Sequence, residues 1–337
     1  MKILFFTGPG EDYLADSMLH GLRSLYGKDC VDYPKCDILY KNCPSVIAKQ
    51  VRGNGFTLYS GLLDDIEIDR YGIDQKIKEN YFDLIIIGSI WKQYGYFTQY
   101  RPWLTGRNTI ILDGADTTQP YPAAGLWWRR PYYWSLPAAH KKFLYFKREW
   151  TPNTHFKLWM RPLPVRIKQL LQPKNLRRIS FSIPEEKIIT QLPEKKKDFP
   201  KHIVDKEVSL GVEGSTNSYA FNSEFEYYQD IQLSNYGITT KRSGWDCLRH
   251  YEIAANGTVL CFKNLHSKPD TCAPHGLNET NTIVYNSLSE LKQKVEKLST
   301  SDYLTYQHNT LIWARNHTTI KQAEKVINEF EAFKAKL

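Results

Sequence analysis

No apolar run in the chain approaches the roughly 20 residues of a membrane span. The first residues, MKILFFTGPGEDY, reach glycine, proline and acid too early for a signal peptide. Cysteine is scarce, with six among 337 residues and none in a C-x-x-C pair. A disulfide scaffold and structural zinc are therefore not expected, and these absences favour a cytoplasmic protein with reduced thiols.

Several ligand-binding motifs are incomplete or missing. The loop after the first apolar run, TGPGEDY, contains Gly8 and Gly10. It lacks the third glycine of a dinucleotide fingerprint and the Gly-Lys-Ser/Thr of a phosphate-binding loop, and a plain tight turn explains it equally well. The sequence has no D-x-D pair and no convincing set of magnesium ligands. We therefore expect no bound metal and no cofactor.

The charge balance favours an anionic partner without selecting one. Lys and Arg outnumber Asp and Glu by 45 to 36, which gives a net charge of +9. Nucleic acid, an acidic membrane face and phosphorylated small molecules all suit such a chain. The segment LWWRRPYYW at 126–134 concentrates aromatic residues and arginine. It suits a membrane interface, a lipid-linked acceptor or a sugar platform, but also buried packing between domains.

The pattern of apolar runs predicts an α/β fold. Short apolar runs such as KILFF, at 2–6, alternate with helical segments and Gly-rich turns over residues 1–150, which is typical of a doubly wound parallel sheet. We interpret 151–175, where Pro and Lys are frequent, as an interdomain connection. Residues 176–317 predict a second, smaller α/β domain, and 318–337 a final helix.

A helix with defined ends is predicted at 244–256, within RSGWDCLRHYEIAANGTVLCF. Ser243 with Asp246 three residues later matches a capping box, and Gly257 stands where a left-handed residue would end the helix. The helix therefore runs directly into the strand TVLCF.

One face of this helix carries polar residues. Trp245, Arg249, Glu252 and Asn256 share that face at helical spacing. Near the crevice of an open α/β sheet, a glutamate can bind a ribose diol and an arginine a pyrophosphate. The alternative is an ordinary surface ion pair between Arg249 and Glu252.

The segment GWDCLRHYEIAANGTVLCF resembles the donor-binding region of GT-B fold glycosyltransferases of the exostosin-like and CgeB-like types. The start, KILFFTGPGEDYLADSMLHGLRSLYG, is similar to the first strand, glycine loop and helix of bacterial family-1-type glycosyltransferases. The resemblance implies two Rossmann-like domains facing a cleft. The N-terminal domain would hold the acceptor, the C-terminal domain the nucleotide-sugar, and the final helix would pack back on the N-terminal domain.

The resemblance also implies roles for single residues. Glu252 would hold the donor ribose, and Arg249 and His250 would contact phosphate or sugar. Lys241 and Arg242 precede the helix and would neutralise the leaving diphosphate, although basic residues there are commonly just solvated. The donor-binding candidates are Gly8, Gly10, Lys241, Arg242, Arg249, His250, Glu252, Asn256 and Gly257.

The catalytic candidates lie in the first half of the chain. Asp12, Asp16 and His20 follow the glycine loop, and LDGAD places Asp113 at the end of an apolar strand. One of these four would act as general base if the mechanism inverts. The ordinary alternatives are a packed or solvated histidine and a common Asp-Gly turn.

We therefore predict a metal-independent glycosyltransferase of cell-surface polysaccharide synthesis. It would move a sugar from a nucleotide-diphosphate sugar to a hydroxyl of a glycan or lipid-linked glycan. We expect a peripheral contact with an anionic membrane at the cytoplasmic face, and no nucleic-acid partner. Two alternatives stay open: a nucleic-acid-binding protein that uses the basic and aromatic surface, and a nucleotide-sugar epimerase of the same fold.

Overall fold

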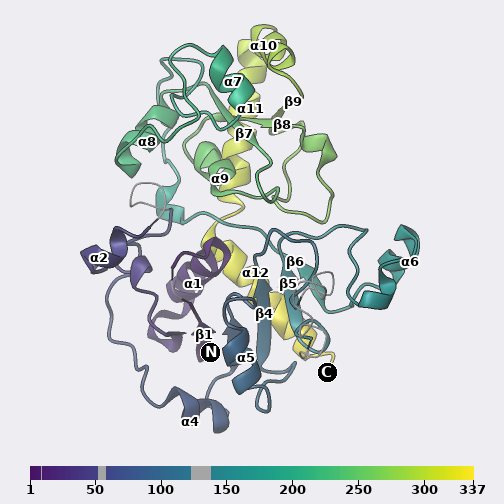
Figure 1. Ribbon diagram of the computed structural model, residues 1–337. Coiled ribbons are helices and arrows are strands. Elements are labelled where there is room, and N and C mark those ends of the chain that lie inside the picture. Colours follow the sequence, from purple (N-terminus) through teal and green to yellow (C-terminus); the bar gives the residue numbers. More distant parts are fainter. Residues whose placement is uncertain (9, 52–57, 123–137) are drawn as a thin grey trace.

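The computed structural model describes residues 1–8, 10–51, 58–122 and 138–337, which contain two parallel sheets (Figure 1). Within the described residues, the first sheet has six strands in the order β2-β1-β3-β4-β5-β6. These strands are β1 (Ile3–Phe6), β2 (Cys30–Tyr33), β3 (Leu84–Ile87), β4 (Thr109–Asp113), β5 (Leu144–Lys147) and β6 (Leu176–Arg178). The segment 126–134, a predicted membrane or acceptor surface, lies outside the described residues.

The central strands of this sheet are buried on both faces. Every residue of β1, β3, β4 and β5 is buried, which explains why these strands are nearly continuous apolar runs. The helices of this unit are α1 (Tyr13–Tyr26), α2 (Ser45–Ala48), α4 (Ile73–Lys78), α5 (Tyr94–Gln99) and α6 (Val165–Leu170). The predicted doubly wound sheet is confirmed.

The second unit is built around β7 (Tyr236–Thr240), β8 (Val259–Lys263) and β9 (Ile283–Tyr285), three parallel strands in that order among the described residues. Its helices are α7 (Lys206–Gly211), α8 (Glu224–Gln232), α9 (Leu248–Ala255), α10 (Leu288–Glu296) and α11 (Thr300–Arg315). The prediction of a second, smaller α/β unit is confirmed, and its three strands are parallel.

The last helix, α12 (Thr319–Lys334), runs from the second unit back to the first, where it packs against α1 (Figure 1). A Cβ atom added to Gly21 of α1 would lie 2.0 Å from the backbone oxygen of Thr319. The two helices therefore touch backbone to backbone at Gly21, and Ala323 and Phe330 of α12 join the core below α1.

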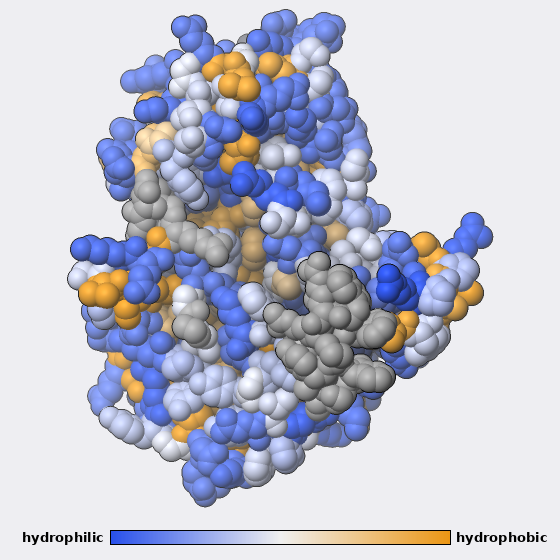
Figure 2. Space-filling view, viewed as in Figure 1, coloured by the Kyte–Doolittle hydropathy of each residue, from blue (hydrophilic) through white to orange (hydrophobic). Residues whose placement is uncertain are grey.

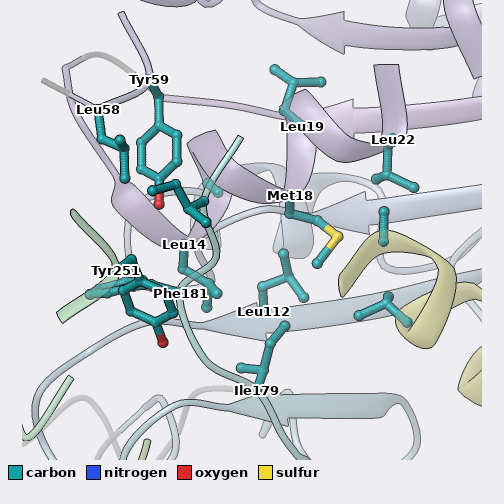
Figure 3. Close-up of a cluster of buried hydrophobic side chains, with 14 of the residues drawn as sticks. Leu14, Met18, Leu19, Leu22, Leu58, Tyr59, Leu112, Ile179, Phe181 and Tyr251 are labelled. Atoms are coloured by element: carbon teal, nitrogen blue, oxygen red, sulfur yellow. The ribbon is translucent and has the colours of Figure 1, made fainter. Parts of the chain in front are cut away.

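One hydrophobic core joins the two units. Leu14 and Met18 of α1 pack with Leu112 of β4, and Tyr251 of α9 belongs to the same cluster through Phe181 (Figure 3). Because α9 is part of the second unit, this contact fixes α9 against the first unit.

The structure differs from the predicted boundary at residue 176. We expected β5 to end the first sheet and the next strand to open the second domain. Instead, Leu176, Arg177 and Arg178 of β6 pair in parallel with Tyr145, Phe146 and Lys147 of β5. The first sheet thus extends past residue 176, with β6 as a short edge strand in which neither arginine is buried.

The candidate ligand helix also begins later than predicted. It starts at Leu248 rather than at residue 244, and Cys247 occupies its N-cap without a side-chain hydrogen bond. Asp246 does not form the expected capping box, because its carboxylate accepts hydrogen bonds from the Phe181 backbone (2.8 Å) and the Tyr251 hydroxyl (3.0 Å). The C-terminus matches the prediction, with Gly257 at φ 67° just after the Asn256 C-cap.

Candidate functional site

A cleft of about 1090 Å³ lies between the two units, visible as a hollow between the upper and lower halves of Figure 2. The loops after β3, β4 and β5 and the start of α1 supply one wall, and the loops before α7, α8 and α9 supply the other. The first unit contributes, among others, Asp12, Trp91, Lys92, Asp116, Tyr121 and Arg148, and the second His202, Tyr219, Arg242, Asp246 and Arg249.

Arg249 is a partly exposed cation in this cleft, and Glu252 on the same helix is an acid whose charge acts on it. Arg249 forms no ion pair with any residue that the structure describes, and its Nε atom is buried without a hydrogen-bond partner there. One terminal nitrogen of its guanidinium lies 3.3 Å from Nε2 of His202. The guanidinium lines the cleft and no carboxylate of the described residues pairs with it, so this position favours an anionic ligand.

His202 is held so that it can accept a hydrogen bond from Arg249. Its Nδ1 donates to the Ser218 carbonyl at 2.8 Å, which leaves the lone pair of Nε2 toward the guanidinium. Burial, followed by the neighbouring Arg249 charge, lowers the pKa of His202, so the ring is neutral at pH 7. The ring stacks on Tyr219, with centroids 5.8 Å apart and planes at 7°.

Arg148, at the end of β5, ties the first unit to the turn before α9. Its guanidinium donates to the backbone oxygens of Gly114 (3.1 Å) and Asp246 (3.0 Å) and pairs with Glu149 (3.1 Å) and Asp116. Glu149 in turn accepts the backbone N–H of Trp245 (2.7 Å) and Asp246 (3.1 Å).

The side chains around Arg148 crowd position 244, which is a glycine. A Cβ atom there would lie 2.6 Å from a carboxylate oxygen of Asp116 and 2.6 Å from one of Glu149. The turn that leads into α9 is thus set by an ion cluster at the floor of the cleft.

On the first unit's side of the cleft, Asp12 is the predicted catalytic candidate whose side chain reaches the wall. It caps α1 by accepting the Ala15 backbone N–H at 3.3 Å, and it pairs with Lys92 at 3.2 Å. Asp116 lines the same wall, and its side chain is 47% exposed. Together with Glu11, these residues are the acids that line the first unit's wall.

The other three catalytic candidates lie away from the cleft wall. His20 bridges α1 to α12, with Nδ1 2.9 Å from the Thr319 hydroxyl and Nε2 3.1 Å from Glu186. Asp16 is buried and accepts the Asp12 backbone N–H; burial raises its pKa well above the usual range. Asp113 is bound to Lys147 (3.1 Å) and the Tyr145 hydroxyl. Each of them serves the packing of the first unit.

Two donor candidates on α9 point into the second unit rather than into the cleft. Glu252 accepts hydrogen bonds from the hydroxyls of Tyr227 (3.2 Å) and Tyr228 (3.4 Å) on α8. Asn256 donates to the Glu252 carbonyl and accepts from Gln232 at 2.7 Å. Neither residue lines the cleft. The shared polar face of the predicted helix is thus divided: Arg249 faces the cleft, whereas Glu252 and Asn256 hold α8 and α9 together.

His250 is a core histidine. Its Nδ1 accepts from the Thr239 hydroxyl and its Nε2 donates to the Trp245 carbonyl, both at 2.9 Å, and the ring stacks on Phe262. Burial lowers its pKa to about 4, so the ring is neutral at pH 7. His250 therefore has no free nitrogen for a ligand.

The remaining donor candidates are spread along the rim. Arg242 lines the cleft and is exposed, whereas the ammonium of Lys241 lies over the Trp245 ring, 5.7 Å from its centroid. Gly8 and Gly10 are not among the cleft residues, although Glu11 and Asp12 directly after them are. Gly10 has φ 72°, a conformation that suits glycine, and so forms the turn that delivers Asp12.

Sequence reasoning did not identify Arg148, Glu149, His202 or Tyr219. Arg148 and Glu149 follow a buried strand in KFLYFKREW, at the edge where ligand sites form in parallel sheets, so that signal was present. His202 lies in the loop before α7 and Tyr219 in the loop between α7 and α8, and no periodicity marks them.

The described residues contain no group of three or more His, Cys, Asp and Glu side chains placed to hold a metal ion. None of the helices found among them is long and apolar enough to span a bilayer.

The pH dependence of stability should reflect the buried histidines. Burial lowers the pKa of His250 to about 4 and that of His140 to about 4. In the unfolded chain both titrate near 6.5, so the unfolded state binds more protons between about pH 6.5 and 4, and stability falls by about 1.4 kcal/mol per pH unit for each histidine. Asp246 acts in the opposite direction. Burial raises its pKa to about 6, so below about pH 6 the folded state binds a proton that the unfolded state does not yet bind. This proton offsets the loss of stability caused by about one histidine.

We therefore expect urea unfolding to give a free energy at pH 5 that is at least about 1 kcal/mol lower than at pH 7. In the variant His250→Gln, the free energy of unfolding should change less steeply with pH, by the equivalent of about one bound proton. Equal stability of the wild type at both pH values would contradict the burial of these rings.

No protein-family model and no curated protein matches the chain. Solved structures match it over almost its whole length. The structure of Anabaena Alr3699/HepE in complex with UDP-glucose has a TM-score of 0.53 at 9% sequence identity and covers 98% of this chain and 100% of its own. A structure of trehalose-6-phosphate synthase, studied for glycosyl transfer with retention, has a TM-score of 0.52 at 11% identity, with coverages of 98% and 99%.

At these identities the likeness shows the fold. The chain has an α/β fold with two parallel sheets that matches the structures of GT-B glycosyltransferases, which confirms the predicted fold class.

Proposed function

We propose that the chain is a glycosyltransferase that binds a nucleotide-diphosphate sugar in the cleft between its two units. The observation that carries this proposal is Arg249: a guanidinium in the cleft, with a buried Nε atom that finds no partner among the described residues. The fold supports it, since HepE, which this chain matches in fold, was solved with UDP-glucose. A planar guanidinium suits the two phosphates of such a donor because it donates several hydrogen bonds in one plane.

The proposed donor site lies on the wall of the second unit. Arg249 would bind the diphosphate, and Arg242 at the rim would add a second positive charge as the diphosphate leaves. Tyr219 stacks on His202 at the same wall, and 68% of its surface is exposed. An exposed aromatic ring beside the phosphate site suits stacking with the base or the sugar of the donor.

The proposed acceptor site lies on the wall of the first unit, with Trp91, Asp12 and Asp116. If the reaction inverts the anomeric centre, a carboxylate here would take the proton from the acceptor hydroxyl. Asp12 is our candidate for this base, because His20, Asp16 and Asp113 are engaged in packing contacts away from the cleft wall.

The finer parts of the prediction belong to this proposal as well. We propose a hydroxyl of a glycan or lipid-linked glycan as the acceptor, transfer without a metal ion, and a role in cell-surface polysaccharide synthesis on the cytoplasmic side of a membrane. The large cleft, with aromatic and acidic side chains on the first unit's wall, supports a polar acceptor of the size of a sugar.

The proposal is tested by thermal unfolding with UDP, GDP, TDP, CDP and ADP. At 100 times its dissociation constant, a nucleotide that binds only the folded state stabilises it by about 2.7 kcal/mol. We expect one diphosphate to raise the unfolding midpoint of the wild type. Arg249→Met should abolish this response, whereas Glu252→Gln, one turn further along α9 but outside the cleft, should keep it.

The unliganded midpoint of each variant separates loss of binding from loss of folding. If no diphosphate stabilises the wild type while single-stranded nucleic acid stabilises it strongly at low salt, the nucleic-acid alternative replaces this proposal.

A further inference from the structure

A long stretch of the first unit carries positive charge only. Between Trp150 and Pro184 the sequence contains no Asp and no Glu. The same stretch contains seven basic residues: Lys157, Arg161, Arg166, Lys168, Lys174, Arg177 and Arg178. A run of this kind makes this part of the surface attractive to anions.

The same stretch exposes an unusual amount of apolar surface. Leu170 at the end of α6 is 85% exposed and Trp159 is 56% exposed. We name this surface the α6 patch, which consists of Leu158, Trp159, Val165, Ile167, Leu170 and Leu171, all of them exposed. It projects at the side of the first unit, where apolar and cationic residues lie together (Figures 1 and 2).

The α6 patch rests on an ordered base. Phe156 and Met160, on either side of Trp159, are buried in the core beneath the sheet with Tyr145. The ammonium of Lys168, on the inner face of α6, is buried and donates to the side chain of Asn153 at 3.1 Å. The apolar residues of the patch are therefore held outward by a fixed support.

We propose that the α6 patch is the surface by which this protein binds an anionic lipid bilayer. The apolar side chains would enter the interface, where tryptophan is favoured, while Lys157, Arg161 and Arg166 would meet the lipid phosphates. A second copy of the chain suits this surface poorly, because it would bring the same cations face to face. This inference does not rest on the proposed nucleotide chemistry.

A basic hollow beside the patch supports an anionic headgroup. It has a volume of about 360 Å³, and its lining includes Trp159 and three lysines, Lys141, Lys157 and Lys174. A phosphate seated there would lie next to the part of the patch that enters the bilayer, so that charge and apolar contact act on the same lipid.

The test is co-sedimentation of the full chain with vesicles of phosphatidylcholine, with and without 30% phosphatidylserine. We expect binding to the anionic vesicles, and weaker binding when salt is raised, because the Debye length shortens. The double variant Arg161→Gln/Arg166→Gln should bind about 30-fold more weakly, at about 1 kcal/mol per cation. Leu170→Ser should weaken binding by about tenfold or more through its lost apolar burial.

Matched controls come from the second unit. Leu210→Ser removes a leucine that is also highly exposed, at 78%, and Lys292→Glu reverses an exposed charge on α10; both should bind vesicles like the wild type. The proposal is overturned if the wild type does not bind anionic vesicles, or if the controls lose binding as much as the patch variants. Self-association that Leu170→Ser abolishes, without vesicle binding, would overturn it as well. The nucleotide response should be unchanged in all of these variants, so that the two proposals fail separately.

Discussion

Replacing Arg148 with methionine is expected to lower the free energy of unfolding by about 3–5 kcal/mol, because removal of one partner leaves a buried carboxylate without its counter-charge. Arg148 is 2% exposed and bonds to two backbone oxygens, one in each unit, as well as to Glu149. Glu149 would keep its backbone donors from Trp245 and Asp246 but would lose its one ion pair among the described residues. Urea unfolding of the wild type and the variant measures the difference.

Lys92→Met is the matched control for this variant. Lys92 also lines the cleft and pairs with an acid, Asp12, but both side chains are partly exposed. Such a pair should contribute no more than about 1 kcal/mol. A loss below about 1 kcal/mol for Arg148→Met would mean that the ion cluster at the cleft floor does not hold the two units together.

Gly21→Ala is expected to lower the free energy of unfolding strongly, because the added methyl group would meet the backbone of α12. The added Cβ would lie 2.0 Å from the Thr319 oxygen and 2.6 Å from the Thr319 carbon, both backbone atoms, so α12 must shift away from α1. Overpacking of this kind costs about 1–3 kcal/mol or more, and the His20–Thr319 hydrogen bond would be strained too.

Gly95→Ala provides the comparison for Gly21→Ala. Gly95 lies in α5, and a Cβ there would meet nothing within 4 Å. This substitution should be neutral or should stabilise by up to about 1 kcal/mol through helix propensity. Equal effects of the two substitutions in thermal unfolding would refute the close packing of α1 and α12.

The sequence predicts those strands and helices whose local pattern of apolar residues agrees with their place in the fold. Buried parallel strands are apolar throughout, and β1, β3 and β4 are therefore visible as short runs. β6 has two arginines in three residues, and only its pairing with β5 makes it a strand. Helix α11 was not predicted, because its apolar residues do not follow one face; it is stabilised by packing on α9 and β8.

The candidate site was predictable only in part, for a physical reason. Periodicity places Arg249 and Glu252 on one face of a helix, but it cannot tell which neighbour each side chain meets. Two tyrosines of α8 reach Glu252, whereas His202, from a distant loop, lies beside Arg249. Contacts between segments far apart in the sequence thus decide which polar residue faces the cleft.

The most direct measurement of the central claim is release of the nucleoside diphosphate from its sugar donor in the presence of glycan acceptors. The donor is the one whose diphosphate stabilises the wild type. We expect release by the wild type and by Glu252→Gln, and a kcat/KM at least about 100-fold lower for Arg249→Met, as for the loss of one charged contact to developing charge. Conversion of the donor sugar without diphosphate release, or equal rates for Arg249→Met and the wild type, would contradict transfer at this cleft.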